Sequence, residues 1–366
     1  MKTTSILTTT IAFIATASNA LAQGSLTPPG APTETMKTLD QIEPRMPVSG
    51  PGTITQPGSY YLTGNIAGQV GKHGIRISAD NVTLDLGGFT LIGVASSDHG
   101  IIANSVDGLT IRNGSVVGFG DRGIEASTSV SSVLERLTVR ASTDKGIAAG
   151  FDSIVRDCIA TGNGSDGIFT NTGALITGCV SNFNSADGFD LSIGCSILDC
   201  IADNNQGSGY FIIQHVTVSR CIARNNAMHG LVTGEGTSVS DSHFMRNTDH
   251  GIRVTNECSI TNNRCIENTG PGIRVNNFSK VRGNFAEDNG RLGDAAGVLV
   301  EGVNNHIDNN TVISNTRGIE ITAIDSIVTS NVASGNGTNF VIIAGNDVAP
   351  ISSAATATSP VANIEN

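Results

Sequence analysis

The sequence predicts an all-β solenoid in which short parallel strands form coils of about 21 residues. Three observations support this fold class: a repeat of fixed length, three stretches of apolar alternation per repeat, and columns of polar residues at the corners. A self-similar unit of this length is typical of a solenoid, whose units bury their apolar faces by stacking on neighbouring units. Asparagine marks the repeat at nine positions, spaced by 21 residues except for one interval of 26: Asn163, Asn184, Asn205, Asn226, Asn247, Asn268, Asn289, Asn315 and Asn336.

The strands follow from the pattern within one repeat. After Gly251, Ile252 and Val254 flank Arg253, two further apolar residues flank Ser259, and a third short stretch follows Asn263. Alternation with a period of two predicts three strands per coil. The second strand has an apolar residue at the same position of every repeat, which predicts an interior stack: Val155, Ile176, Ile197, Val218, Val239, Ile260, Val281, Ile307 and Val328.

A second polar column lies five residues before the asparagine column, at the predicted corner between the second and third strands. We expect asparagine there to tolerate the left-handed conformation and to hydrogen-bond the turn or the amide one coil away. The glycine before each first strand serves the other tight corner. The members of this second column are Cys158, Cys179, Cys200, Cys221, Ser242, Asn263, Asn284, Asn310 and Asn331.

A three-stranded coil with corner asparagines resembles the right-handed parallel β-helix of the pectate lyase and polygalacturonase superfamily. The resemblance covers residues 74–343 and implies about 12–13 coils. Residues 36–66 resemble the start of secreted, uncharacterised bacterial β-helix repeat proteins. The catalytic aspartate motifs of the hydrolases, N-T-D and G-D-D, and their G-H-G have no match, the nearest strings being Asp98-His99-Gly100 and Asp249-His250-Gly251.

The chain divides into five predicted segments. Residues 1–22 read as a signal peptide cleaved after Ala22, which predicts a secreted or envelope location. Residues 23–50 form a linker rich in proline and threonine, 51–73 an N-terminal cap, 74–343 the β-helix, and 344–366 a disordered tail. No later segment is long and apolar enough to span a membrane.

Composition limits the partners. The formal net charge of −11 opposes binding to nucleic acid and to anionic membranes. Tryptophan is absent and aromatic residues make up 4%, which argues against a strong carbohydrate groove. The four column cysteines stack about 4.8 Å apart, which permits either disulfides or, as we favour, a reduced apolar filler.

Two clusters are candidate sites, because the resemblance implies an active site on the outward face of a strand. The first cluster contains His229, His250, Arg253 and Arg274. In a β-elimination, His250 or Arg253 could act as the base, and Arg274 as the cation that stabilises the developing charge. The alternative is a solvated corner that tolerates histidine.

The second cluster is acidic, with Asp166 and Asp187 stacked and Asp190 on the following strand. Stacked carboxylates repel unless they are protonated or bridged, so calcium is a candidate ligand, with solvated surface carboxylates as the alternative. No cofactor is expected to be required for folding. Phe169 and Phe211 are expected to face outward and offer a surface for self-association.

These features lead to two functional hypotheses. The favoured one is a secreted, non-catalytic or weakly specialised rod that contacts an extracellular polysaccharide or a surface protein. The alternative is a polysaccharide lyase that acts on a uronate polymer, and a glycoside hydrolase is less well supported because its motifs are missing.

Overall fold

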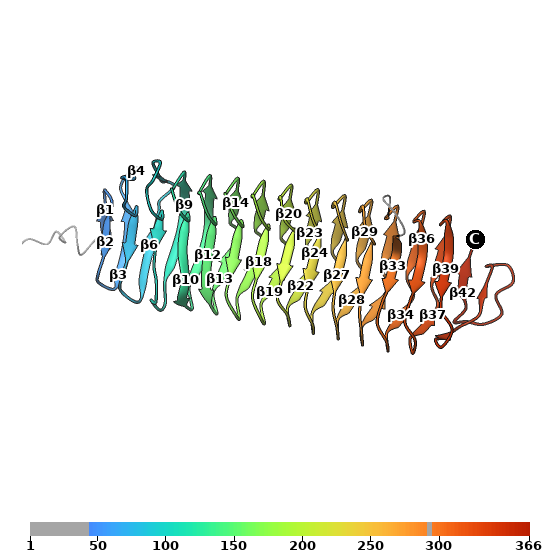
Figure 1. Ribbon diagram of the computed structural model, residues 1–366. Helices are drawn as coiled ribbons and strands as arrows, with labels where there is room; N and C mark the ends of the chain where they lie inside the picture. Colours follow the sequence, from blue (N-terminus) through green and yellow to red (C-terminus); the bar gives the residue numbers. More distant parts are fainter. Residues whose placement is uncertain (1–43, 291–294) are drawn as a thin grey trace, which may run out of the picture. The chain divides into compact units, whose positions relative to one another are not determined.

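The computed structural model describes residues 44–290 and 295–366 of the chain (Figure 1). The predicted signal peptide and residues 23–43 of the predicted linker lie outside the described residues. Residues 45–366 form one compact unit, in which parallel strands stack coil upon coil. Within the described residues there is no helix, so none that could cross a membrane.

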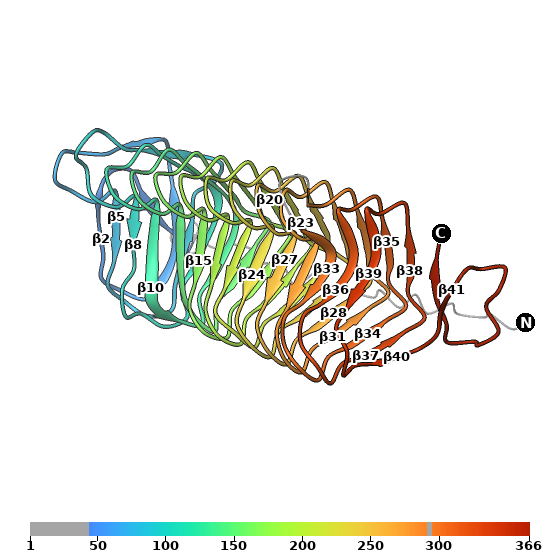
Figure 2. The same ribbon diagram turned by 45° about the vertical axis from the view of Figure 1, so that its right-hand side comes forward.

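One sheet of 14 parallel strands runs along the described coils, and we call it the first-strand sheet (Figure 2). Neighbouring strands pair in register, so that Ile168 lies beside Phe189 and Phe189 beside Tyr210. Its strands are β2 (Gly52–Ile54), β5 (Ile75–Ile77), β8 (Ile101–Ile102), β10 (Ile124–Val130), β12 (Ile147–Phe151), β15 (Ile168–Thr170), β18 (Phe189–Leu191), β21 (Tyr210–Ile212), β24 (Leu231–Thr233), β27 (Ile252–Val254), β30 (Ile273–Val275), β33 (Ala296–Val300), β36 (Arg317–Ile321) and β39 (Thr338–Ile342).

The second and third strands of the described coils build the other two faces. The second strands are β3 (Gly58–Leu62), β6 (Val82–Asp85), β9 (Thr110–Val117), β11 (Val133–Arg140), β13 (Ile154–Arg156), β16 (Leu175–Thr177), β19 (Ser196–Leu198), β22 (Thr217–Ser219), β25 (Ser238–Ser240), β28 (Ser259–Thr261), β31 (Lys280–Arg282), β34 (His306–Asp308), β37 (Ile327–Thr329) and β40 (Asp347–Val348). The third are β4 (Ile66–Ala67), β7 (Thr90–Ile92), β14 (Ile159–Thr161), β17 (Val180–Asn182), β20 (Ile201–Asp203), β23 (Ile222–Arg224), β26 (His243–Met245), β29 (Arg264–Ile266), β32 (Phe285–Glu287), β35 (Thr311–Ile313), β38 (Val332–Ser334) and β42 (Asn363–Glu365). Strands β9 and β11 run on through the third position, while β1 (Met46–Val48) pairs with β3 and β41 (Ile351–Ser352) with β42.

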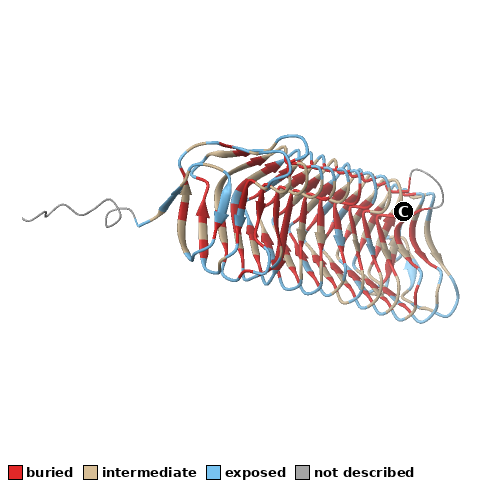
Figure 3. Ribbon diagram, turned by 60° about the vertical axis from the view of Figure 1, so that its left-hand side comes forward, coloured by how far each residue is buried: buried red, intermediate tan, exposed pale blue. Residues whose placement is uncertain are grey.

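The core fills the interior of the coils. In the regular three-residue first strands the outer two residues point inward and the middle residue points outward, as in Ile168, Phe169 and Thr170. The middle residue of each second and third strand points inward instead, as Ile176 and Ala202 do. Figure 3 shows the result, with buried positions inside the coils and exposed positions at the corners. The three-strand coil predicted from the alternation is therefore confirmed.

The corner columns hold adjacent coils together by side-chain amides. Asn184 donates from its Nδ2 to Oδ1 of Asn205, at 3.0 Å, and Asn205 bonds Asn226 in the same way. The longer interval does not break the column, since Nδ2 of Asn289 lies 3.1 Å from Oδ1 of Asn315. All seven cysteines are buried and free, as favoured for the column.

One prediction about the corners needs correction. The column residues do not adopt the left-handed conformation; the residue just before each of them does. Phe183 precedes Asn184 with a φ of 54°, and Asn309 precedes Asn310 with a φ of 56°. The left-handed residue turns the chain outward at the corner, so that the following asparagine points inward and can bond its neighbours.

The two ends of the solenoid also differ from the predictions. Residues 46–48 of the predicted linker form β1. The predicted cap supplies β2, β3 and β4, which make up an additional coil that the predicted number of 12–13 coils does not include. The expectation of a disordered tail over residues 344–366 is wrong, because β40, β41 and β42 lie there. Asn363 makes this possible: its Oδ1 accepts from Nδ2 of Asn331 at 3.1 Å, which adds a further member to the second column.

Candidate functional site

A ladder of charges runs along the corner that leads into the first-strand sheet. In successive coils, the residue before the coil-starting glycine contacts an acid of the next coil. His73 lies 3.8 Å from Asp98, and Nε of Arg122 lies 2.8 Å from Asp144. We call this row the charged corner; its other pairs are His99 with Asp121, Lys145 with Asp166, and His229 with Asp249.

The position before the coil-starting glycine is uncharged in several coils, Ser208, Pro271 and Ala296 being three examples, and a pocket opens at Ser208, which Gly207 precedes. A Cβ at position 207 would lie 2.4 Å from Oδ1 of Asp187, so only glycine fits beside that carboxylate. The opening has a volume of about 250 Å³, and we call it the central pocket; it is lined by Asp187, Ser208, Phe211, Met228, His229, Val232 and Arg253.

The central pocket continues across the outward face of the first-strand sheet. A second hollow, of about 310 Å³, shares Phe211, Val232 and Arg253 with it and reaches Ile213 and Thr255. The two hollows therefore form one surface, on which an apolar floor lies between polar rims.

The predicted acidic cluster is present, and a lysine occupies its centre. Nζ of Lys145 forms an ion pair with Asp166 and lies 3.5 Å from Oδ2 of Asp190. The ammonium thus places a positive charge between Asp166 and Asp190, two of the three carboxylates predicted as calcium ligands. Oδ1 of Asp166 also accepts from the backbone N–H of Asp187, at 3.0 Å.

Asp187 is set apart from the other two aspartates. Among the described residues no ammonium group contacts it directly, and its Oδ1 accepts a backbone N–H, that of Ser208, at 2.5 Å. Burial, aided by the charges of Asp166 and Asp190, raises the pKa of Asp187 to about 6. A carboxyl group in this range exchanges its proton near neutral pH, which suits a general acid or base.

The predicted histidines also meet in space. Nδ1 of His229 lies 3.5 Å from Oδ2 of Asp249, and Nδ1 of His250 lies 2.5 Å from Oδ1 of the same carboxylate. Burial lowers the pKa of His229 to about 4 and lowers the pKa of His250, so both rings are neutral at pH 7. His229 lines the central pocket, whereas His250 does not.

The two predicted arginines have different surroundings. Arg253 is exposed, reaches both hollows, and has no carboxylate partner among the described residues. Arg274 is held by Glu301, whose Oε2 lies 2.7 Å from its Nε. Of the two, Arg253 is therefore the cation available to a ligand in the central pocket.

The apolar stripe predicted around Phe169 and Phe211 is divided. Asp190 pairs in register between the two rings, and the ammonium of Lys145 lies 4.8 Å from the centre of the Phe169 ring. Phe211 is 42% exposed and joins Val232 as the floor of the central pocket. The exposed ring of Phe211 is therefore part of the central pocket.

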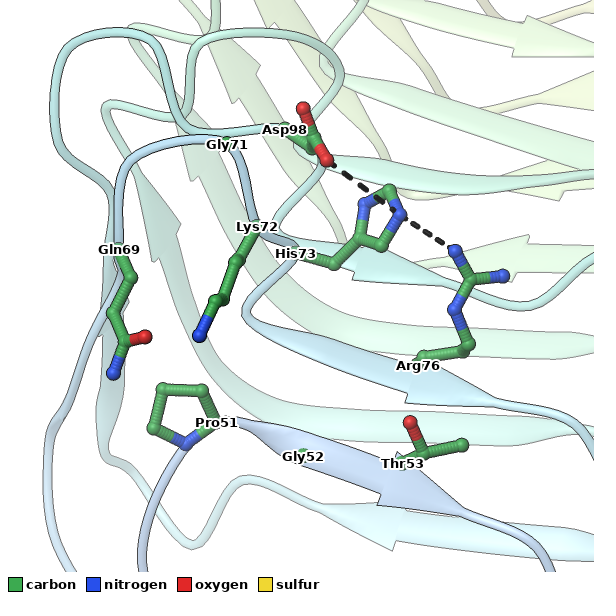
Figure 4. A pocket seen from close by; sticks show the side chains of 9 residues that line it. All are labelled: Pro51, Gly52, Thr53, Gln69, Gly71, Lys72, His73, Arg76 and Asp98. Carbon is green, nitrogen blue, oxygen red and sulfur yellow. Dashed lines mark hydrogen bonds and ion pairs between the residues drawn. The ribbon is translucent and has the colours of Figure 1, made fainter.

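A further pocket of about 550 Å³ lies in the first coils (Figure 4). His73 lies between Asp98 and Arg76 there, with Nε2 accepting from the guanidinium at 2.7 Å. Lys72 extends toward Pro51 on the opposite wall (Figure 4). Apart from the proline and the imidazole, the lining is polar or glycine, so this pocket has no apolar floor like that of the central pocket.

The sequence prediction lacked Lys145 and Gly207 and gave Asp249, which lies beside the histidines, no role. Lys145 and Asp249 act across coils, on partners 21 and 20 residues away, and Gly207 acts by having no side chain. The signal that could have found them is the column itself, since a break in a row of charges at Gly207 and Ser208 is visible once the coils are aligned.

Comparison with known proteins identifies the repeat. The family described as right handed beta helix region matches residues 73–228, 195–312 and 231–356. The right-handed parallel β-helix expected from the sequence is thereby confirmed. A search of curated proteins finds no match.

Several solved structures share the fold. The A-modules of two Azotobacter vinelandii mannuronan C-5 epimerases align with TM-scores of 0.59 and 0.57, at 17% and 18% identity; the alignments cover 85% and 79% of this chain and 91% and 90% of theirs. The tailspike protein of E. coli bacteriophage HK620, solved in complex with a pentasaccharide, aligns with a TM-score of 0.55 at 12% identity, over 84% of this chain and 71% of its own. At these identities the likeness shows the fold alone.

Proposed function

This chain belongs to the right handed beta helix family, and from that premise we propose that it binds a polysaccharide at the central pocket. The binding surface is the outward face of the first-strand sheet between Asp187 and Arg253. The ligand is a polysaccharide that carries carboxylates or many hydroxyls.

The observation that carries this proposal is the break in the charged corner. Where the row of ion pairs stops, the carboxyl of Asp187, the ring of Phe211 and the guanidinium of Arg253 line one opening. A sugar ring has an apolar C–H face and polar edges, so it can lie on Phe211 and Val232 while its edges reach the two charged groups. Ligand sites commonly combine an apolar lining with a few polar groups in this way.

The length of the surface fits a polymer better than a small molecule. The central pocket and its neighbour share three residues, and both are shallow and open to solvent. Epimerases of mannuronan and a tailspike bound to a pentasaccharide share the fold, which supports a saccharide ligand. The net charge of −11 makes nucleic acid a poor alternative.

A second function, β-elimination on a uronate polymer, is favoured by one observation. Asp187 has a pKa of about 6 and shares the central pocket with Arg253. In this reaction Asp187 removes the proton α to the uronate carboxylate, at C5, and Arg253 stabilises the charge that develops. The C4–O bond then breaks as the C4=C5 double bond forms, and the leaving oxygen takes a proton from water. These roles replace His250 and Arg274, because His250 faces Asp249 and Arg274 is paired with Glu301.

The test is a binding panel of neutral and uronate polysaccharides, with and without calcium. We expect retention of at least one polymer, and a loss of about tenfold in affinity for Phe211→Ala and for Arg253→Ala, since central contacts dominate binding. Phe183→Ala, which removes an exposed ring on a different corner, is the matched control and should bind normally.

The same panel separates the two functions. Ultraviolet absorbance from unsaturated products, lost in Asp187→Asn while binding persists, would establish elimination. Binding without product leaves the non-catalytic rod. If no polymer is retained, or if Phe211→Ala and Phe183→Ala behave alike, the central pocket is not the binding surface.

A further inference from the structure

His229, Asp249 and His250 converge at the charged corner in a way that the glycan proposal does not use. His229 and His250 directly precede Gly230 and Gly251, so they occupy the same corner position in adjacent coils. The first strands that follow, β24 and β27, pair in register, with Leu231 beside Ile252. The fold therefore brings the two imidazoles together edge to face, with ring centres 5.0 Å apart, and Asp249 lies directly before the second.

The geometry brings three ligand atoms together. One atom from each of the three side chains lies within 4.8 Å of the other two. Oδ2 of Asp249 is 3.5 Å from Nδ1 of His229. Zinc bonds of 2.0–2.2 Å in a tetrahedral site separate ligand atoms by about 3.4 Å, so this spacing fits a metal ion between them.

The ring nitrogens lack other partners. Nδ1 of His229 and Nδ1 of His250 are both enclosed and make no hydrogen bond among the described residues. The carboxylate of Asp249 lies within ion-pair distance of both, at 3.5 Å from Nδ1 of His229 and 2.5 Å from Nδ1 of His250. Since His229 is only 5% exposed, water does not readily replace the missing partner. A metal ion bound to both nitrogens would satisfy them together.

The same chain offers a comparison at the other end of the charged corner. His73, Asp98 and His99 repeat the same residue types at the same corner positions, and their rings stack at 5.2 Å. There one nitrogen of each ring has a partner: Arg76 donates to Nε2 of His73 at 2.7 Å, and the backbone N–H of Arg122 donates to Nδ1 of His99 at 3.3 Å, while Nδ1 of His73 is enclosed without one. This second trio does not bring its ligand atoms together, so residue type alone does not produce the convergence.

We propose that His229, Asp249 and His250 form a binding site for a divalent transition-metal ion of the zinc class. Two imidazoles and one carboxylate favour zinc, cobalt or nickel over calcium, which prefers a shell of oxygens. With three protein ligands, the ion keeps at least one position for water or a ligand. His229 also lines the central pocket, so that position is within reach of the saccharide surface.

The charges around the site are compatible with a cation. Asp249 contributes one negative charge to the ligand set. Arg274, which lies nearby, is paired with Glu301, and Arg253 extends into solvent. Asp187, the acidic residue in the lining of the central pocket, offsets the guanidinium of Arg253.

The test uses the purified full chain, free of metal, titrated with cobalt or zinc by calorimetry and followed by the visible bands of bound cobalt. We expect one ion per chain, a loss of at least about tenfold in affinity for the double variant His229→Ala with His250→Ala, and a smaller loss for Asp249→Asn. The matched control is His73→Ala with His99→Ala, which should bind as the parent does. Calcium should not compete with cobalt.

If the double variant fails to fold, the proposal can still be tested on the parent chain by nuclear magnetic resonance of its histidine nitrogens. In the parent chain, zinc should shift the imidazole nitrogen resonances of two of the seven histidines. Absence of saturable binding, unchanged affinity in a folded double variant, or a loss in the His73 and His99 control would overturn the proposal. None of these measurements involves a polysaccharide, so they stand apart from the test of glycan binding.

Discussion

At the scale of single residues, the neighbours of a side chain in the next coil decide its chemistry. Asp166 and Asp187 have the same residue type and the same corner position in adjacent coils. Asp166 pairs with the ammonium of Lys145, whereas Asp187 faces a pocket and accepts a backbone N–H. One carboxylate is thereby part of the structural ladder, and the other is free to exchange a proton.

The raised pKa of Asp187 predicts a pH-dependent stability. Its ordinary pKa is 3.8 and its folded value is about 6, so the folded state prefers the neutral form and loses stability as pH rises from about 4 through 6. Asp187→Asn removes this penalty. We expect the variant to be more stable than the parent by about 1 kcal/mol at pH 8, after allowance for solvent screening, and equal to it at pH 4.

Urea unfolding at the two pH values measures this difference. Asn can still accept the N–H of Ser208, so the local hydrogen bond is kept. Asp325→Asn, at an exposed corner, is the control. An equal change at both pH values would show that Asp187 is not held in an unfavourable charged form.

The site could be predicted only in part, and the reason lies at this scale. His229, Asp187 and Arg253 were all identified from the sequence, because they stand at corner or outward positions of the repeat. Their union in one pocket was not, because it depends on which side chains of four successive coils leave space between them, and the break in the row of charges at Ser208 shows only once the coils are aligned.

At the scale of the element, each corner works as a pair of residues. One residue takes the left-handed conformation at the surface, and the next points its side chain inward. Asn310 shows how much the inward member does: its Nδ2 donates to Val281 and Asn331, both at 2.9 Å, and its Oδ1 accepts from the backbone N–H and the side chain of Asn284.

Removal of that amide should be costly. Asn310→Ala leaves several buried donors and acceptors without partners, and we expect the free energy of unfolding to fall by about 3 kcal/mol. Asn309→Gly is the matched control, because the neighbouring exposed residue has a φ of 56° that glycine adopts without strain. Denaturant midpoints compare the two variants with the parent. A similar loss in both would mean that the turn, rather than the column, stabilises the corner.

The columns were visible in the sequence, but the position of the left-handed residue was not. Asparagine recurs at the inward position, and it also tolerates the left-handed conformation, so the prediction placed that conformation on the asparagine. The residues that carry it, such as Phe183, Arg246 and Glu267, are chemically diverse and show no pattern. A backbone requirement that many side chains can meet leaves little trace in a single sequence.

At the scale of the whole solenoid, the last coils are covered by residues 344–366, a segment that was predicted to be disordered because of its composition. Alanine, serine, threonine and proline between residues 353 and 360 suggest disorder, and Asn363 follows Asn331 by 32 residues rather than 21. Because of this irregular interval, the sequence does not reveal that Asn363 belongs to the second column. In the structure β42 pairs with β38 in parallel, with Val332 beside Ile364.

Deletion of residues 347–366 should therefore expose sheet edges. β37 and β38 lose the partners β40 and β42, and the amide of Asn331 loses Oδ1 of Asn363. Open edges of parallel strands recruit other chains, so we expect the truncated protein to form oligomers and the parent to stay dispersed at the same concentration. Light scattering measures the difference, and Asn363→Ala, which keeps the strands, should remain dispersed. A dispersed truncated protein would show that the edge needs no cover.

The longer interval between Asn289 and Asn315 has a consequence for how such a chain can change over generations. Four of the five additional residues lie in the sequence between Asn289 and Gly297, before the first strand, and the fifth lies between the first and second strands; the two amides still meet at 3.1 Å. Mutation can thus lengthen or rewrite the corner that leads into the first-strand sheet without cost to the inherited framework. The central pocket lies at this same corner of the repeat. Changes in sequence or length there can therefore alter ligand specificity one coil at a time.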